Sequence, residues 1–163
     1  MKRTITALAG TAAAGLAMLA APPLHAQYRQ KIGHSPAKCA GGDPAVWVTI
    51  NGVSASRGTI RVQSYRATAQ DWLESGRWIN RIEIPAKAGQ MTVCMPVPGP
   101  GRYGIAVRHD VNGNGKTDLS ADGGAMSNNP SINIFNLGKP SYRKVGVDVG
   151  SGVKSITVTM RYM

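Results

Sequence analysis

Alternation of apolar and polar residues is the main pattern along this chain. After residue 45, stretches in which every second residue is apolar recur at short intervals. Alternation with a period of two is typical of β-strands that bury one face and expose the other. The pattern predicts seven short strands and almost no helix. The predicted strands lie at residues 46–50, 59–63, 81–84, 91–95, 103–109, 144–149 and 155–162.

Turn signals, rather than helices, separate these strands. Residues 56–58 (Ser-Arg-Gly) predict a short hairpin connection, and the proline- and glycine-rich residues 96–101 predict a rigid corner. One or two helical turns are expected at 67–75, with Trp72 and Leu73 as their apolar anchor. Strands with one apolar face bury it best as two sheets packed face to face. The sequence therefore predicts an all-β fold, a seven-stranded antiparallel β-sandwich.

Tyr103 is expected to lie in the core of this sandwich. It follows the 96–101 corner and shares one face of its strand with Ile105 and Val107. Because alternate residues of a strand point to the same side, all three are expected to be buried. Tyr103 should lie at the start of a central strand.

The first residues have the features of an export signal. Lys2 and Arg3 precede an apolar run over residues 5–21, and residues 24–26 offer a cleavage site ending in a small residue. A membrane anchor is the alternative, but the run is rich in Ala and Gly and short for a bilayer core of ~30 Å. We expect a periplasmic or secreted protein with no transmembrane segment after cleavage. The expected parts are a signal peptide at 1–26, an irregular segment at 27–44 and a sandwich domain at 45–163 with a long loop at 110–142.

The two cysteines, Cys39 and Cys94, both lie in the part of the chain that is expected to be exported. An even number of cysteines in an oxidising compartment favours a disulfide. Alternation places Cys94 on the outer face of its strand, where a partner in the irregular N-terminal segment can reach it. Two free buried thiols are the alternative. We expect the bond, which the chain-entropy model values at about 4 kcal/mol of stability.

The chain is strongly basic, with 19 Lys and Arg against 8 Asp and Glu and a net charge of +11. The basic residues are scattered, and no Lys/Arg run is interleaved with aromatic residues. An exported protein also rarely meets nucleic acid, so no nucleic-acid partner is expected. Anionic envelope polymers or lipid headgroups are the partners that such a charge favours. We expect the protein to be a monomer.

Residues 109–118 carry the most informative chemical pattern. Oxygen-bearing side chains recur at alternating positions, and Gly115 allows the chain to curl around an ion. Hard oxygen ligands on a curled loop are what calcium prefers. The expected calcium ligands are the side chains of Asp110, Asn112, Asn114 and Asp118 and the backbone carbonyl of Lys116.

This loop departs from the EF-hand pattern that it partly matches. The position of the usual bidentate Glu is Ala121, Asp122 comes one residue late, and no helices flank the loop. The alternative is an Asn/Gly turn held by hydrogen bonds from side chains to the backbone, since Asn and Gly tolerate a positive φ. Both interpretations stay open at this stage.

Signals for catalysis are weak. His109 and Asp110 are neighbours on a strand, so their side chains point to opposite faces. Ser127 and Asn128 could bring polar groups near His109, but the sequence has no nucleophile elbow and no paired carboxylates. We interpret His109 as a structural residue at a strand end. An envelope-associated hydrolase that uses His109 near Ser127 is the alternative.

Several short stretches together resemble the bacterial domain-of-unknown-function family 2141, a set of small exported proteins. The resemblance implies an exported β-sandwich and no particular activity. The 100–107 corner and strand are also similar to those of transthyretin-like and carboxypeptidase-regulatory-like sandwiches, and a transthyretin-like or immunoglobulin-like fold is expected. The stretches that carry the family resemblance are 53–62, 72–73, 100–107, 109–118, 127–129, 145–149 and 156–162.

These observations favour a non-catalytic binding or structural module of unknown ligand, with calcium at 110–118 as one alternative. Binding residues concentrate on long loops carried by rigid scaffolds, so the 110–142 loop is the expected working surface. A purely structural envelope domain with basic outer faces is a second hypothesis. An enzyme is not expected.

Overall fold

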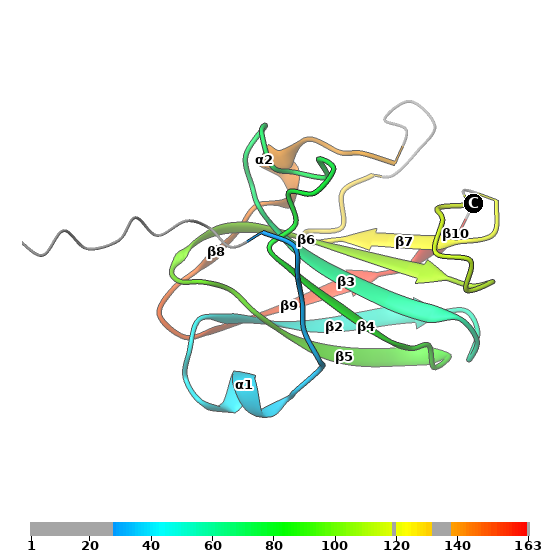
Figure 1. The fold of residues 1–163 in the computed structure, drawn as a ribbon, viewed down its shortest axis with the longest axis horizontal. Coiled ribbons are helices and arrows are strands. Elements are labelled where there is room, and N and C mark those ends of the chain that lie inside the picture. The colour runs from blue at the N-terminus through cyan, green and yellow to red at the C-terminus, as the bar shows by residue number, and fades with distance from the viewer. Residues whose placement is uncertain (1–27, 119, 132–137, 163) are drawn as a thin grey trace, which may run out of the picture.

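The computed structural model describes residues 28–118, 120–131 and 138–162, and in this part of the chain two β-sheets pack face to face (Figure 1). The larger sheet has the strand order β1-β4-β3-β6-β7-β10, with β8 also paired to β6. Its strands are β1 (Gln30–Lys31), β3 (Thr59–Arg66), β4 (Asn80–Pro85), β6 (Gly101–Asp110), β7 (Gly123–Met126), β8 (Val147–Val149) and β10 (Arg161–Tyr162). The smaller sheet has the order β5-β2-β9 and contains β2 (Ala45–Val53), β5 (Gly89–Pro96) and β9 (Val153–Thr159).

The expected all-β sandwich is confirmed, but it is mixed rather than purely antiparallel. The strands β1 and β4 run parallel to each other, as do β2 and β9. Each of the seven expected stretches forms at least part of a strand, and β1 and β7 are additional. The stretch expected as one strand at 155–162 is two, because the chain leaves the smaller sheet after β9 and joins the larger sheet at β10. Residues 142–145, at the start of the expected 144–149 strand, form the one-turn helix α2 (Tyr142–Val145).

The connection at 56–58 is not a hairpin. The strands that it joins, β2 and β3, belong to different sheets, so the chain crosses the sandwich here. Gly58 has a φ of 73°, and a Cβ atom at this position would lie 2.0 Å from the carbonyl oxygen of Asp110. Glycine is therefore required by close packing of the crossing segment against the end of β6, which the sequence pattern of a turn cannot distinguish from a hairpin.

The main hydrophobic core fills the space between the two sheets. Inward-facing residues come from both sheets with the expected alternation, and Tyr103 is buried at 1% exposure, as expected. Its hydroxyl donates a hydrogen bond of 2.8 Å to the carbonyl of Gly99 in the preceding corner. Fully buried residues of this core include Val46, Val48, Ile50, Ile60, Val62, Ile82, Val93, Met95 and Ile105.

The disulfide between Cys39 and Cys94 is present, with a Cα–Cα distance of 5.8 Å. Cys94 pairs with Trp47 on β2, and Cys39 lies on the short helix α1 (Ala37–Ala40). The segment expected to be irregular, 27–44, thus contains both α1 and the strand β1. Figure 1 shows α1 and α2 on opposite sides of the two sheets. The expected signal peptide lies outside the described residues, and no helix among those described is long and apolar enough to cross a membrane.

A smaller second core lies on the outer face of the larger sheet. It is built by Tyr65, Trp72, Trp78, Met126 and Val145. Trp72 packs directly on the backbone of β6, where a Cβ atom at Gly104 would lie 2.5 Å from its ring. The segment that was expected to be helical at 67–75 is a series of turns, with a hydrogen bond from the amide of Trp72 to the carbonyl of Thr68. This layer covers only part of the outer face.

Candidate functional site

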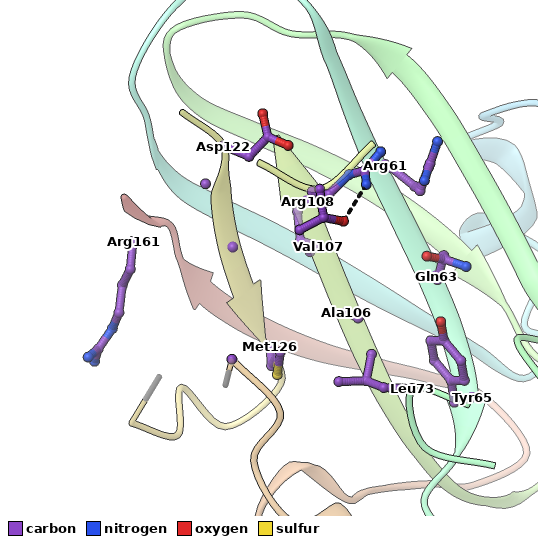
Figure 2. A pocket seen from close by; sticks show the side chains of 14 residues that line it. Arg61, Gln63, Tyr65, Leu73, Ala106, Val107, Arg108, Asp122, Met126 and Arg161 are labelled. Carbon is purple, nitrogen blue, oxygen red and sulfur yellow. Dashed lines mark hydrogen bonds between the residues drawn. The ribbon is translucent and has the colours of Figure 1, made fainter. Parts of the chain in front are cut away.

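A hollow remains on the uncovered part of the larger sheet's outer face. It has a volume of about 350 Å³, within the range of small-molecule sites. Its floor and walls come from β3, β6, β7 and β10 and from the turn that contains Leu73. Figure 2 shows Arg61 and Arg108 together near one end of the hollow, and Tyr65, Leu73 and Met126 near the other. The hollow therefore has a cationic end and an apolar end.

The cationic end follows from the register of four neighbouring strands. Arg61 pairs with Arg108, Arg108 pairs with Gly124, and Gly124 pairs with Arg161. Residues that pair directly across a sheet project from the same face. Three arginines and one glycine thus form a single cross-strand row, which we call the arginine row: Arg61, Arg108, Gly124 and Arg161.

Gly124 leaves an open position within the arginine row. Its φ lies outside the left-handed region, and a Cβ atom built there would have no other atom within 4 Å. The neighbouring Gly123 is different, because its Cβ would lie 2.3 Å from the ring of Tyr162. The packing around Gly123 requires glycine, whereas neither backbone conformation nor packing requires it at Gly124.

Three carboxylates act on the arginine row, namely Glu83, Asp110 and Asp122, and Asp122 also lines the hollow. The Nε of Arg61 donates to the Oε1 of Glu83 at 2.6 Å, and the Nη2 of Arg108 lies 3.4 Å from the Oδ2 of Asp110. Arg161 is exposed and forms no ion pair with any residue that the structure describes.

Burial and mutual repulsion act on the arginines of this face. The pKa of Arg108 is lowered, first by burial and then by the nearby positive charge of Arg61. The pKa of Arg81, on β4, is lowered by the same two causes in the same order. In addition, the Nε of Arg108 is buried without a hydrogen-bond partner. An anion placed near this row would relieve the repulsion between the guanidinium groups.

The apolar end lies one row further along the strands. Ala106 pairs with Met126 and with Gln63, and Tyr65 follows two residues later on β3. Tyr65 makes an edge-to-face contact with Trp72, with ring centroids 5.4 Å apart. Leu73 lines this end of the hollow, and its side chain is half-buried. Its backbone φ of 54° lies in the left-handed region, which is unusual for a leucine.

The hollow continues into a second, more open one of about 580 Å³ that shares Gln63, Tyr65 and Leu73 with it. This second hollow reaches Arg29, Lys31 and Arg81, whose guanidinium group lies 4.1 Å from the centroid of the Trp78 ring. Positive charge thus continues along the outer face beyond the arginine row.

The 110–118 loop brings several of the expected calcium ligands together. The Oδ2 of Asp118 accepts hydrogen bonds from the side-chain amides of Asn112 at 2.9 Å and Asn114 at 2.6 Å. These two hydrogen bonds lower the pKa of Asp118. The three side chains therefore converge on one point, as the alternating spacing predicts.

The other two expected ligands engage the backbone. Asp110 accepts from the amides of Asn114 at 3.1 Å and Gly115 at 2.8 Å, and the amide of Lys116 donates to the Oδ1 of Asn114 at 2.7 Å. These are the hydrogen bonds that the turn interpretation requires. No three His, Cys, Asp or Glu side chains gather into a metal site within residues 28–118, 120–131 and 138–162. Calcium binding stays a prediction, and its test is given in the Discussion.

Asp122 closes the loop, a role that the sequence did not reveal. Its Oδ1 accepts from the amide of Val111 at 3.2 Å and its Oδ2 accepts from the amide of Asp118 at 3.0 Å. The available signal was its place one residue after Ala121, where an EF-hand loop has its bidentate Glu. Arg108 joins this loop to the hollow, because its Nη1 donates to Thr117 Oγ1 at 2.7 Å and its Nη2 to the carbonyl of Gly115 at 3.0 Å.

The residues of the hydrolase alternative are not brought together. His109 is fully buried, with Nδ1 at 2.8 Å from the Tyr162 hydroxyl and Nε2 at 2.8 Å from the carbonyl of Arg57. Ser127 lies opposite Ile105. That position is about 13 Å along β6 from His109 at the usual rise of a strand.

The polar stretch 127–129 instead joins segments of the sandwich. The hydroxyl of Ser127 donates to the carbonyl of Val145 at 2.6 Å and accepts from the amide of Ile105 at 3.0 Å. Asn129 donates to the carbonyl of Thr157 and accepts from the amide of Thr159, which satisfies the edge of β9. This stretch therefore has a structural role that local sequence reasoning did not assign.

Comparison with known proteins agrees with the resemblance seen in the sequence. A family model described as an uncharacterized protein conserved in bacteria (DUF2141) matches residues 48–157. This range begins in β2, ends in β9 and includes most of the hollow and the whole 110–118 loop. Comparisons with curated proteins and with solved structures gave no match.

Proposed function

We propose that this chain, which belongs to the bacterial family DUF2141, is a non-catalytic binding module of the periplasm or the extracellular space, and that it binds an anionic ligand in the hollow on its larger sheet. The observation that carries the proposal is the arginine row, in which Arg61, Arg108 and Arg161 share one cross-strand row with the open position at Gly124. The strongly positive charge of the whole chain adds attraction at longer range.

The distribution of ion pairs along the row supports an anion as the ligand. Glu83 and Asp110 hold Arg61 and Arg108 in place and offset their charge, whereas Arg161 has no ion-pair partner among the described residues. Arginine presents its donors in a planar fork that suits carboxylate and phosphate groups. Because the donors of Arg108 are already bonded or buried, Arg161 is the arginine of the row with which an anion near Gly124 would pair.

The site overlaps the surface that the sequence favoured. The 110–142 segment was expected as a long loop and as the working surface, and Gly124 and Met126 of this segment line the hollow from the strand β7. In this proposal the 110–118 loop has a supporting role, because Arg108 is fixed by Thr117 and the carbonyl of Gly115. Calcium binding by the loop, if it occurs, would act on the hollow through Arg108.

A titration followed by two-dimensional NMR tests the proposal. Acetate and inorganic phosphate are added to the isotopically labelled protein, and the backbone amides of the arginine row are expected to shift most. Arg161→Gln should weaken the affinity for either anion about two- to five-fold, as expected for an exposed charge. Lys154→Gln removes one positive charge from β9 in the other sheet and should leave the affinity unchanged.

Two results would contradict the proposal. Equal weakening by Lys154→Gln and Arg161→Gln would show that the anions respond only to net charge. Shifts distributed evenly over both sheets would show that no defined anion site exists.

A further inference from the structure

We infer that the ligand of the hollow is an amphiphile, a single anionic headgroup attached to an alkyl chain. This inference rests on the proposed function and adds the apolar part of the ligand. The headgroup lies over Gly124 within the arginine row, and the chain lies against Tyr65, Leu73 and Met126 at the other end.

The distribution of polar and apolar groups in the hollow is the first reason. One row of the sheet presents arginines, and the next presents Ala106 and Met126 together with the uncharged Gln63 on the same face, so charge is lost over a single step along the strands. A polymer with charge at every unit would place some of its charges against the apolar end. Burying a charge there without a partner is unfavourable, so the part of the ligand that lies against the apolar end of this hollow should carry no charge.

The backbone of Leu73 is the second and independent reason. A bulky residue with a φ of 54° pays a conformational penalty that Asn or Gly would largely avoid. Residues held in such conformations concentrate at functional sites. At this position the strained residue presents a half-buried apolar side chain to the hollow.

Gly124 is the third reason. A side chain there would fill the hollow, and nothing in the surrounding structure excludes one. Glycine inside a strand weakens it and often marks a place where a ligand approaches the backbone closely. The position next to the arginines is thus kept open at some loss of strand stability.

A series of alkyl carboxylates provides the test. Butyrate, octanoate and the neutral octanol are titrated into the protein below their micelle concentrations, and affinities are measured by calorimetry. Each buried methylene should raise affinity about four-fold, so octanoate should bind at least about ten-fold more tightly than butyrate. Octanol should bind more weakly than octanoate, because it cannot pair with the arginine row.

A variant of Leu73 tests the apolar end separately. Leu73→Asn suits the left-handed backbone and removes the apolar wall, so it should reduce the affinity for octanoate at least about five-fold and leave butyrate nearly unchanged. Val153→Asn is the matched control, since Val153 is an exposed apolar residue on β9 in the other sheet. It should change neither affinity.

The outcomes separate this inference from the proposed function. Equal binding of butyrate and octanoate, both weakened by Arg161→Gln, would overturn the alkyl chain and leave the anion site in place. Binding of octanol as tight as that of octanoate, unaffected by Arg161→Gln, would overturn the anionic headgroup and the proposed function with it. Octyl phosphate, compared with octanoate, shows whether the source of the headgroup is a phospholipid or a free fatty acid, and preferential binding of either supports the inference.

Discussion

The two faces of the larger sheet differ although the same strands build both, with alternate residues facing each side. On the inner face, Ile60 and Val62 of β3 and Ile105 of β6 are fully buried against the smaller sheet. On the outer face, their neighbours Arg61 and Arg108 line a hollow. The inner face is buried against the other sheet, so its residues are determined by packing. On the outer face, packing leaves the position of Gly124 open. A position whose residue type is not required by packing or backbone conformation is a good place to look for function.

The largest effect is expected on the inner face. Tyr103→Ala should lower the free energy of unfolding by about 3–5 kcal/mol, because it leaves a cavity in the core and removes the hydrogen bond to Gly99. Chemical denaturation of both proteins measures the difference. A loss below about 1 kcal/mol would show that the inner face tolerates open space after all, and the contrast between the two faces would fail.

A smaller effect is expected where the outer face meets its covering layer. Ser127→Ala leaves the amide of Ile105 and the carbonyl of Val145 without the hydroxyl that both contact. Unsatisfied buried polar groups cost about 1–3 kcal/mol each, so the variant should be less stable by an amount in this range. Ser127→Thr retains a hydroxyl and serves as the control. Full stability of Ser127→Ala would show that the stretch 127–129 does not join the two layers.

Calcium is expected to give an effect of about 1.4 kcal/mol if the 110–118 loop binds it, measured at ten times the dissociation constant. Asp110→Ala should abolish this gain, and Lys116→Ala should preserve it, since only the backbone carbonyl of Lys116 would serve as a ligand. The quantity compared is the calcium-dependent shift in melting temperature within each variant, because Asp110 also accepts two backbone hydrogen bonds.

The turn interpretation makes the opposite prediction for the same loop. Melting temperatures that agree between excess chelator and several millimolar calcium would contradict the metal site. In that case Asn114→Ala should still lower stability, since the amide of Lys116 and the carboxylate of Asp118 both bond to the Asn114 side chain.

The inner face could be predicted from the sequence far better than the outer face. Alternation identified the buried sides of β2, β3 and β6, and the observed burial agrees with it. Alternation also placed Cys94 on the outer face of its strand, β5, and the disulfide with Cys39 is present. Alternation reports only which residues share a face. It does not contain strand order or direction, and so the parallel pairing of β2 with β9 was not foreseen.

The hollow was missed for a related physical reason. Arg61, Arg108 and Arg161 look like scattered surface charge in the sequence, and only the pairing of four strands places them in one row. The strand β7 itself was not predicted, because Gly123 and Gly124 carry no side chains that could alternate. The convergence of Asn112, Asn114 and Asp118 was predicted because these residues are close in sequence, whereas the contacts of Asp122 depend on how the loop closes.

The central claim is that the open position at Gly124 is a binding site, and Gly124→Leu tests it most directly. A leucine there should fill the hollow without a clash, and replacing a strand glycine should leave stability unchanged or raise it by up to about 1 kcal/mol. Gly150→Leu is the matched control, because a Cβ atom there also meets open space, at the far end of the sheet beyond β8. The affinity of each folded variant for octanoate is measured by calorimetry. The account predicts that Gly124→Leu abolishes binding and Gly150→Leu retains it, and wild-type affinity in Gly124→Leu would contradict it.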